Sequence, residues 1–256
     1  IIGNKLRHRG GEEDKMSDND MRKIIVEAHR GCSAKYPENT LISFEAALEL
    51  GVDAVEFDIW LSKDKIPVIV HDGYVERTTD GKGHVRDKTL QEIKQLDAGR
   101  WFDEKFSGQR IPTLRETLEV LTKSPNLMLG VEIKEYTFET VDLTIGLLNE
   151  FGCVARCFFY CFNARIIKYL KHKYNVTTMG YPDFMMKEFE PDSYKYYDEI
   201  GIRMDLATPE FCERFAKMGF PLHIYCADNE ADVIRAIECG ASLITANDPV
   251  PLIRIL

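Results

Sequence analysis

Short apolar runs alternate with longer amphipathic segments along most of the chain. The runs are rich in Val and Ile and end in polar residues, as strands of a buried parallel sheet do. Eight of them predict strands at residues 24–28, 52–57, 66–70, 127–131, 154–160, 176–180, 222–226 and 242–246. We interpret a ninth run, 200–206, as an extended loop. Strands that alternate with helices in this way predict an α/β fold, the TIM (βα)8 barrel.

The intervening segments have apolar residues at helical spacing. After a predicted N-cap at Asn39, such residues recur from Leu41 to Leu48, and Gly51 is expected to stop this helix. Thr208 and Pro209 carry the cap and first-turn signals of a later helix. The same spacing predicts helices at 113–123, 137–151, 163–173, 208–218 and 229–239.

Two stretches depart from a regular barrel repeat. Between Asp58 and Pro67 there are too few residues for a crossover helix, so we expect an extended segment that returns to the bottom of the barrel. Residues 74–111 contain turn signals and one short helix-like stretch at 89–96. We interpret them as a small insertion after the third strand, placed over the face that carries the active site.

Length and composition agree with one large domain. The chain has 256 residues, and a TIM barrel takes about 250. We assign residues 21–256 to this single domain and expect residues 1–20, which are highly charged, to form a disordered or tag-like leader. A net charge of −9 argues against nucleic acid as a partner, and any bound anion would need a local positive potential.

The cysteine pattern and the hydropathy of the chain indicate its cellular compartment. The seven cysteines form no close C-x-x-C pair, so we expect neither a disulfide framework nor structural zinc. Cys153, Cys157 and Cys161 are evenly spaced but lie in an aromatic stretch, which favours buried packing. No apolar run approaches the roughly 20 residues of a membrane span, and no signal peptide is visible. We therefore expect a cytoplasmic protein without a transmembrane segment.

Four polar clusters follow four of the predicted strands. They are His29-Arg30-Gly31, Glu56-Phe57-Asp58, His71-Asp72 and Glu132-Ile133-Lys134. In a parallel barrel the carboxyl ends of all strands share one face, so these distant residues can converge on one pocket. Three carboxylates can hold a hard cation, two histidines can move protons, and two basic side chains can hold an anion. Each cluster alone is weak evidence, whereas the four together indicate a phosphate-handling site.

Other histidines lie outside these clusters. His84, His172 and His223 have no neighbouring carboxylate motif, so we expect no role for them in the site. Asp72 is more easily explained as a residue that orients His71 than as a catalyst.

The motifs together resemble the glycerophosphodiester phosphodiesterases. The resemblance covers residues 24–250 and rests on the four clusters and on Pro37-Glu38-Asn39-Thr40, Lys63-Asp64, Arg77-Thr78-Thr79 and Ile111-Pro112-Thr113-Leu114. It implies a βα barrel with a small insertion after the third strand. It also implies hydrolysis of small-molecule glycerophosphodiesters to sn-glycerol 3-phosphate and an alcohol, with a divalent cation as cofactor.

The resemblance also implies roles for particular residues. The metal ligands would be Glu56, Asp58 and Glu132, and the acid–base pair would be His29 and His71. Arg30 and Lys134 would contact the phosphate, and Glu38 would line the substrate site. Ligands that are all oxygen favour Mg²⁺ or Ca²⁺ over zinc. Similarity to phosphatidylinositol-cleaving phospholipase barrels suggests His29 as the base and His71 as the acid.

Two late motifs depart from the family pattern. Tyr225-Cys226-Ala227-Asp228 stands where the family has Trp-Thr-Val-Asn, and the final strand motif Ile244–Pro249 is one residue longer. Both departures concern the shape of the glycerol or alcohol pocket. A lysophospholipase D or sphingomyelinase D-like activity on a lipid therefore remains an alternative, with residues 95–106 or 181–190 as a possible apolar channel. A barrel that binds phosphodiesters without catalysis is a further alternative.

Overall fold

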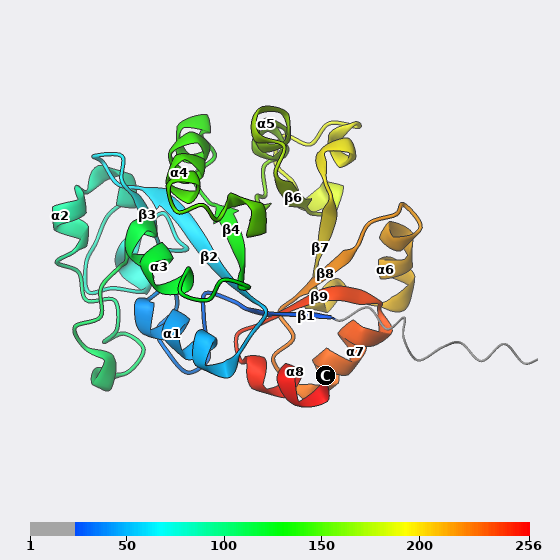
Figure 1. The fold of residues 1–256 in the computed structure, drawn as a ribbon, viewed down its shortest axis with the longest axis horizontal. Coiled ribbons are helices and arrows are strands. Elements are labelled where there is room, and N and C mark those ends of the chain that lie inside the picture. The colour runs from blue at the N-terminus through cyan, green and yellow to red at the C-terminus, as the bar shows by residue number, and fades with distance from the viewer. Residues whose placement is uncertain (1–23) are drawn as a thin grey trace, which may run out of the picture.

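The computed structural model describes residues 24–256, so our expectation for residues 1–20 lies outside the described range. Eight parallel strands close into a barrel, which confirms the predicted fold class (Figure 1). The barrel strands are β1 Ile25–Ala28, β2 Ala54–Leu61, β4 Met128–Ile133, β5 Cys157–Tyr160, β6 Thr177–Gly180, β7 Glu199–Arg203, β8 Leu222–Tyr225 and β9 Ala241–Ala246. Closure comes from β1, which pairs with both β2 and β9.

The helices lie around the outside of the strands (Figure 1). They are α1 Leu41–Leu50, α3 Leu114–Leu121, α4 Phe138–Glu150, α5 Ala164–Tyr174, α6 Pro209–Ala216, α7 Glu230–Glu238 and α8 Pro249–Ile255. Thr113 forms a capping box with Glu116 at the start of α3, and Thr208 caps α6 ahead of Pro209. Gly51 ends α1 in the left-handed conformation, as predicted.

Two strand predictions were wrong. Residues 66–70 contribute β3, Pro67–Ile69, which pairs antiparallel with the end of β2 and lies outside the closed barrel. The extended run that we interpreted as a loop instead supplies barrel strand β7, which pairs with β6 and β8. A buried apolar run of this length is compatible with either orientation, and only the pairing partners distinguish the two.

The connection between β2 and β3 also differs from our expectation. The chain does not return to the bottom of the barrel, because Ser62 donates its backbone N–H to Ile66 and the two strands form a hairpin. β2 is long enough to extend past its neighbours, so the hairpin folds back along it. Val70 then donates its N–H to the Asp58 carbonyl, which returns the chain to the rim of the barrel.

Residues 74–111 form the predicted insertion. It contains α2, Leu90–Ile93, and the 3₁₀ turns Val75–Arg77, Val85–Asp87 and Glu104–Phe106. These elements share a small apolar core with β3, separate from the main core around the barrel: Val68, Val70, Val75, Val85, Ile93, Ala98 and Ile111. Within residues 24–256, no helix is both long and apolar enough to cross a membrane.

Candidate active site

A buried group of three carboxylates lies at the carboxyl ends of β2 and β4. Glu56 and Asp58 are two residues apart on β2, so both point to the same side of the strand. Glu132 on β4 is the register partner of Asp58. One oxygen from each carboxylate lies within 4.8 Å of the others, and the exposed fractions of the three residues are 2, 0 and 6 %. The group can therefore hold one cation.

The oxygens of this group fit a hard metal ion. Glu56 Oε1 is buried without a hydrogen-bond partner among residues 24–256. Asp58 Oδ1 and Glu132 Oε1 face the Lys134 ammonium at 3.3 and 2.7 Å but lack hydrogen-bond geometry. Oxygen-only ligands with unused lone pairs suit Mg²⁺ or Ca²⁺, which bind carboxylates in this way.

Burial and neighbouring charges shift the pKa values of the two β2 carboxyls in opposite directions. Burial, and then the negative charge of Asp58, raises the pKa of Glu56 well above its usual range. Burial would also raise the pKa of Asp58, but the Lys134 ammonium and the Arg30 guanidinium hold it well below its usual range. Asp58 is thus the carboxylate that stays ionised, and the basic side chains offset part of the charge of the group.

Arg30 connects the carboxylate group to Glu38. Its Nε lies 3.2 Å from Asp58 Oδ2, and Nη1 donates to Glu38 Oε1 at 3.0 Å. Its backbone N–H, in the left-handed conformation at φ 56°, donates to Glu56 Oε2. Arg77 binds the same Glu38 through both Nη atoms. This network places the predicted phosphate contacts beside the carboxylates, and their role stays a prediction.

His29 follows β1 and projects into the same pocket. Its Nδ1 contacts Asn247 Oδ1 at 2.7 Å and Cys226 Sγ at 3.4 Å, while Nε2 lies 3.9 Å from Glu56 Oε2. Burial, followed by the nearby Arg30 charge, lowers the pKa of His29 to about 3. The imidazole is therefore neutral at pH 7 and can accept a proton.

His71 reaches the rim through the β2–β3 hairpin rather than through a barrel strand. Its Nδ1 contacts Asp72 Oδ1 at 2.6 Å, and Arg77 binds the other oxygen of Asp72. The Trp60 indole donates to the His71 backbone carbonyl at 3.1 Å. A carboxylate on Nδ1 fixes the tautomer and leaves Nε2 to exchange a proton with a ligand.

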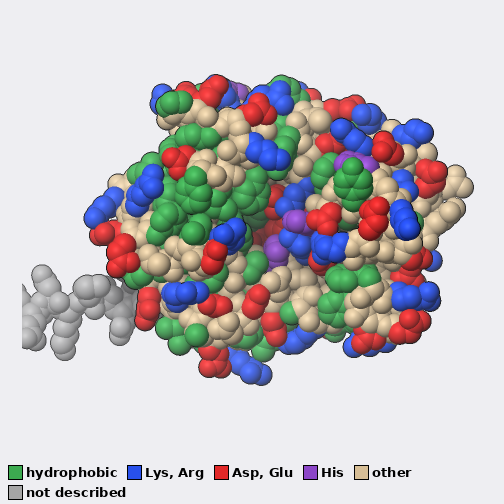
Figure 2. Space-filling view, turned by 180° about the vertical axis from the view of Figure 1, so that it is seen from behind, with side chains coloured by type: hydrophobic (Ala, Val, Ile, Leu, Met, Phe, Trp, Pro, Cys, Tyr) green, Lys and Arg blue, Asp and Glu red, His purple; other side chains and the backbone are tan. Residues whose placement is uncertain are grey.

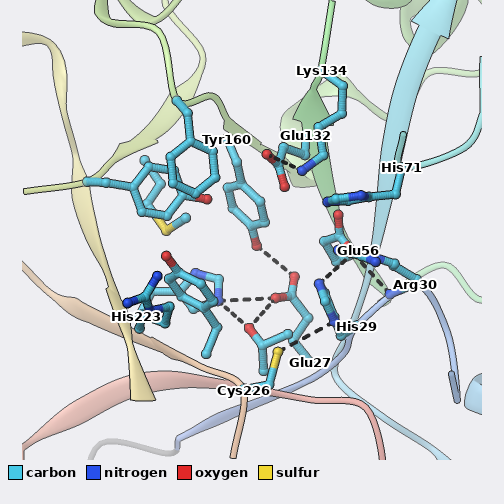
Figure 3. A pocket seen from close by; sticks show the side chains of 16 residues that line it. Glu27, His29, Arg30, Glu56, His71, Glu132, Lys134, Tyr160, His223 and Cys226 are labelled. Atoms are coloured by element: carbon cyan, nitrogen blue, oxygen red, sulfur yellow. Dashed lines mark hydrogen bonds and ion pairs between the residues drawn. The ribbon is translucent and has the colours of Figure 1, made fainter. Parts of the chain in front are cut away.

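A cavity of about 350 Å³ lies at the carboxyl end of the barrel, and the site residues that line it are His29, Arg30, Glu56, His71, Glu132 and Lys134. Figure 2 shows a hollow with histidine, acidic and basic side chains at its centre and hydrophobic side chains along one edge. The close view in Figure 3 shows that the polar side chains come from several strands and surround the cavity. Its aromatic and apolar wall is formed by Tyr160, Phe162, Met179, Tyr181 and Tyr225.

Several residues of the site were missed or misassigned from the sequence. Asn39 is not the cap of α1, which is Thr40; at φ 56° it instead donates to Asp58 Oδ2 at 2.7 Å. Asn247 and Trp60 hold the two histidines, although neither carried a signal. His223, for which we expected no role, lines the cavity. Its position in an alternating strand was the available signal, because it shares a side with Tyr225.

Comparisons with known proteins agree with this site. Residues 29–250 match the model of the glycerophosphoryl diester phosphodiesterase family. A glycerophosphodiester phosphodiesterase of Caldanaerobacter subterraneus is 35% identical over 246 residues, covering 91% of this chain and 98% of the relative. One from Bacillus subtilis is 30% identical, covering 89% and 84%.

A solved structure shows the same fold with a bound product. It is an Oleispira antarctica phosphodiesterase in complex with sn-glycerol-3-phosphate, 27% identical, with a TM-score of 0.80 and coverage of 90% of this chain and 95% of that one. The family model spans most of the chain, and the resemblance seen in the motifs is thereby confirmed. The chain belongs to the glycerophosphoryl diester phosphodiesterase family of enzymes.

Proposed function

We propose that this protein hydrolyses glycerophosphodiesters to sn-glycerol 3-phosphate and an alcohol. The observation that carries the proposal is the buried carboxylate group flanked by His29 and His71 in one cavity. Cleaving a phosphodiester requires charge neutralisation at the phosphoryl oxygens and proton transfer on both sides of phosphorus. The cavity contains groups suited to each task.

Glu56, Asp58 and Glu132 would hold a divalent cation, Mg²⁺ or Ca²⁺. When bound, such a cation supplies positive charge to the phosphoryl oxygens and lowers the cost of attack at phosphorus. Arg30 and Lys134 lie against the same carboxylates and would contact the phosphate. Arg30 can meet two oxygens through its planar fork, whereas Lys134 acts as a point charge. Glu38 would line the substrate site and orient Arg30 through their ion pair.

The two histidines would divide the proton transfers. His29 is neutral because burial lowers its pKa to about 3, and its Nδ1 contacts Asn247, which leaves Nε2 as the nitrogen that would remove a proton from water or from the glycerol 2-hydroxyl. His71, oriented by Asp72, would protonate the departing alkoxide. Each transfer contributes roughly 10²–10⁴-fold to the rate.

The test is release of sn-glycerol 3-phosphate from glycerophosphocholine and glycerophosphoethanolamine with Mg²⁺, Ca²⁺ or EDTA. Glu56→Ala should abolish release, while Glu45→Ala, at an exposed position on α1, should leave it unchanged. Binding of phosphodiesters by folded protein without turnover in any metal would support the binding-module alternative instead.

A lipid substrate is the second candidate function. Phe162, Met179 and Tyr181 form part of the cavity wall, and hydrophobic side chains flank one edge of the hollow (Figure 2). Such an edge could accept an acyl chain. Turnover of lysophosphatidylethanolamine should be measured beside glycerophosphoethanolamine at equal concentration below the micellar limit. Faster turnover of the lipid than of glycerophosphoethanolamine would favour a lipid as the substrate.

A further inference from the structure

The cavity extends below the catalytic groups to a second set of polar side chains. Glu27, Tyr160, His223 and Thr245, here called the floor cluster, all line the cavity. Glu27 lies on β1, and His29 follows this strand two residues later, so Glu27 lies about 6.6 Å deeper in the barrel on the same side. None of these residues has a role in the mechanism above.

Glu27 is the centre of the floor cluster. The Tyr160 hydroxyl donates to Oε1 at 2.7 Å, and the Thr245 hydroxyl donates to Oε2 at 2.7 Å. His223 Nε2 lies 3.1 Å from Oε2 and also contacts the Thr245 hydroxyl. The dashed lines of Figure 3 trace these contacts. Glycine at position 130 leaves room for them, since a Cβ there would lie 2.4 Å from Glu27 Oε1.

The contacts on Nε2 determine what the other ring nitrogen can do. Thr245 gives its hydroxyl hydrogen to Glu27, so both oxygens that face His223 Nε2 are acceptors. Nε2 must therefore carry a hydrogen, which leaves Nδ1 as the ring nitrogen that can accept one from a ligand. The residue is only 2 % exposed, and its Nδ1 is buried without a hydrogen-bond partner within the described part of the chain. A buried acceptor without a partner is costly unless a ligand supplies a donor.

A second unpartnered group lines the same cavity. Tyr225 is two residues from His223 on β8 and lines the same cavity, and its hydroxyl is also buried without a partner among residues 24–256. The adjacent Cys226 contacts His29, so this side of the cavity leads from the proposed base to β8. A phosphate at the carboxylate group would direct the part of the substrate beside His29 toward these two groups.

We propose that His223 Nδ1 and the Tyr225 hydroxyl form a subsite that binds the free hydroxyls of the glycerol moiety. This inference rests on the proposed function and makes it more specific. An acyl ester on the terminal glycerol oxygen would replace the hydroxyl donor by an ester acceptor, which Nδ1 cannot bind. The subsite therefore selects deacylated glycerophosphodiesters and disfavours lysophospholipids.

The test measures binding by calorimetry in the presence of Mg²⁺, with no turnover needed. The ligands are sn-glycerol 3-phosphate and 1,2-propanediol 1-phosphate, in which a methyl group replaces the terminal hydroxymethyl group. Wild type should prefer the first about tenfold, the equivalent of one hydrogen bond of about 1.4 kcal/mol. Tyr225→Phe and His223→Phe should each reduce this preference to about threefold or less.

The variants differ in their structural risk. Tyr225→Phe removes a hydroxyl that has no internal partner, so its melting temperature should equal or exceed that of wild type. His223→Phe deprives Glu27 of a contact, and His172→Phe is its control, because His172 is exposed and packs on Tyr196 away from the cavity. Equal affinity of wild type for the two ligands, or an unchanged preference in both β8 variants, would overturn the subsite.

Failure of the subsite is distinguishable from failure of the proposed function. A wild type that prefers glycerol 3-phosphate but releases none from glycerophosphoethanolamine would retain the subsite and lose the proposed activity. If wild type releases glycerol 3-phosphate but binds both ligands equally, the proposed activity is supported and the proposed subsite is rejected.

Discussion

At the scale of single residues, the site places like charges together at a cost in stability. Glu56 and Asp58 are buried two residues apart, and Glu56 resists ionisation because of burial and of that neighbour. Sites built for function commonly accept such a cost, so removing the charge often stabilises the protein.

Glu56→Gln should therefore raise stability while it abolishes the proposed activity. We expect the free energy of unfolding in EDTA at pH 8 to rise by about 1 kcal/mol, because the amide removes the cost of keeping the buried Glu56 carboxyl either protonated or charged beside Asp58. The amide oxygen can still accept from the Arg30 backbone N–H. Urea unfolding measures the change, with Glu45→Gln on the exposed face of α1 as the matched control. A less stable variant would show that the Glu56 carboxylate is net stabilising.

His29 predicts a dependence of stability on pH. Burial lowers its pKa to about 3 in the native state from an ordinary value of 6.5. Between these values the unfolded chain binds a proton that the native protein does not, so stability falls as the pH drops below 6.5. One such group contributes a slope of up to about 1.4 kcal/mol per pH unit.

His29→Asn should flatten this slope. We expect the variant to lose less stability than wild type between pH 6.5 and 4.5, as measured by urea unfolding in EDTA. The raised pKa of Glu56 acts with the opposite sign, because the native state then holds the extra proton. Both proteins should therefore carry Glu56→Gln as well. If stability then falls equally with pH in the two proteins, His29 is not the group that causes the pH dependence.

At the scale of elements, the β2–β3 hairpin determines where His71 lies. The strand run at 66–70 was identified correctly as apolar and extended, but its orientation was not. Local propensity describes a segment, whereas orientation depends on which strand it pairs with and on how far β2 extends beyond the barrel. The prediction that His71 follows an extended segment at the rim was correct for a different structural reason.

The contact that holds this hairpin end can be tested through its tryptophan. Trp60→Phe removes the hydrogen bond to the His71 carbonyl and should lower kcat of the proposed reaction about tenfold, because small displacements of the proposed acid would be costly. Trp101→Phe is a matched control: its indole also donates to a backbone carbonyl, that of Ala98 in the insertion. Equal kcat values for the two variants would show that the Trp60 contact does not position His71.

At the scale of the whole molecule, the barrel brings acidic side chains from separate strands to one end. The chain carries a net charge of −9, and Arg30 and Lys134 compensate locally at the carboxylate group. A cation that binds only the folded arrangement of the three ligands stabilises the native state by mass action.

Saturating metal should therefore raise the unfolding temperature of wild type and EDTA should reverse the change. At about 100 times the dissociation constant, the gain in free energy of unfolding is about 2.7 kcal/mol. Asp58→Asn should abolish most of the shift for both Mg²⁺ and Ca²⁺, whereas Asp64→Asn in the β2–β3 loop should keep it. A full shift in Asp58→Asn would place the bound cation elsewhere.

The sequence alone determined the barrel class, most helices and the residues of the four polar clusters that meet at the proposed site, because periodicity, caps and motif order are local properties of the chain. Tertiary structure decided the rest. Which strands close the barrel depends on pairing, so β3 and β7 were misassigned. The positions of Asn39, Asn247 and His223 in the site depend on contacts between residues up to 218 positions apart, which no local pattern encodes.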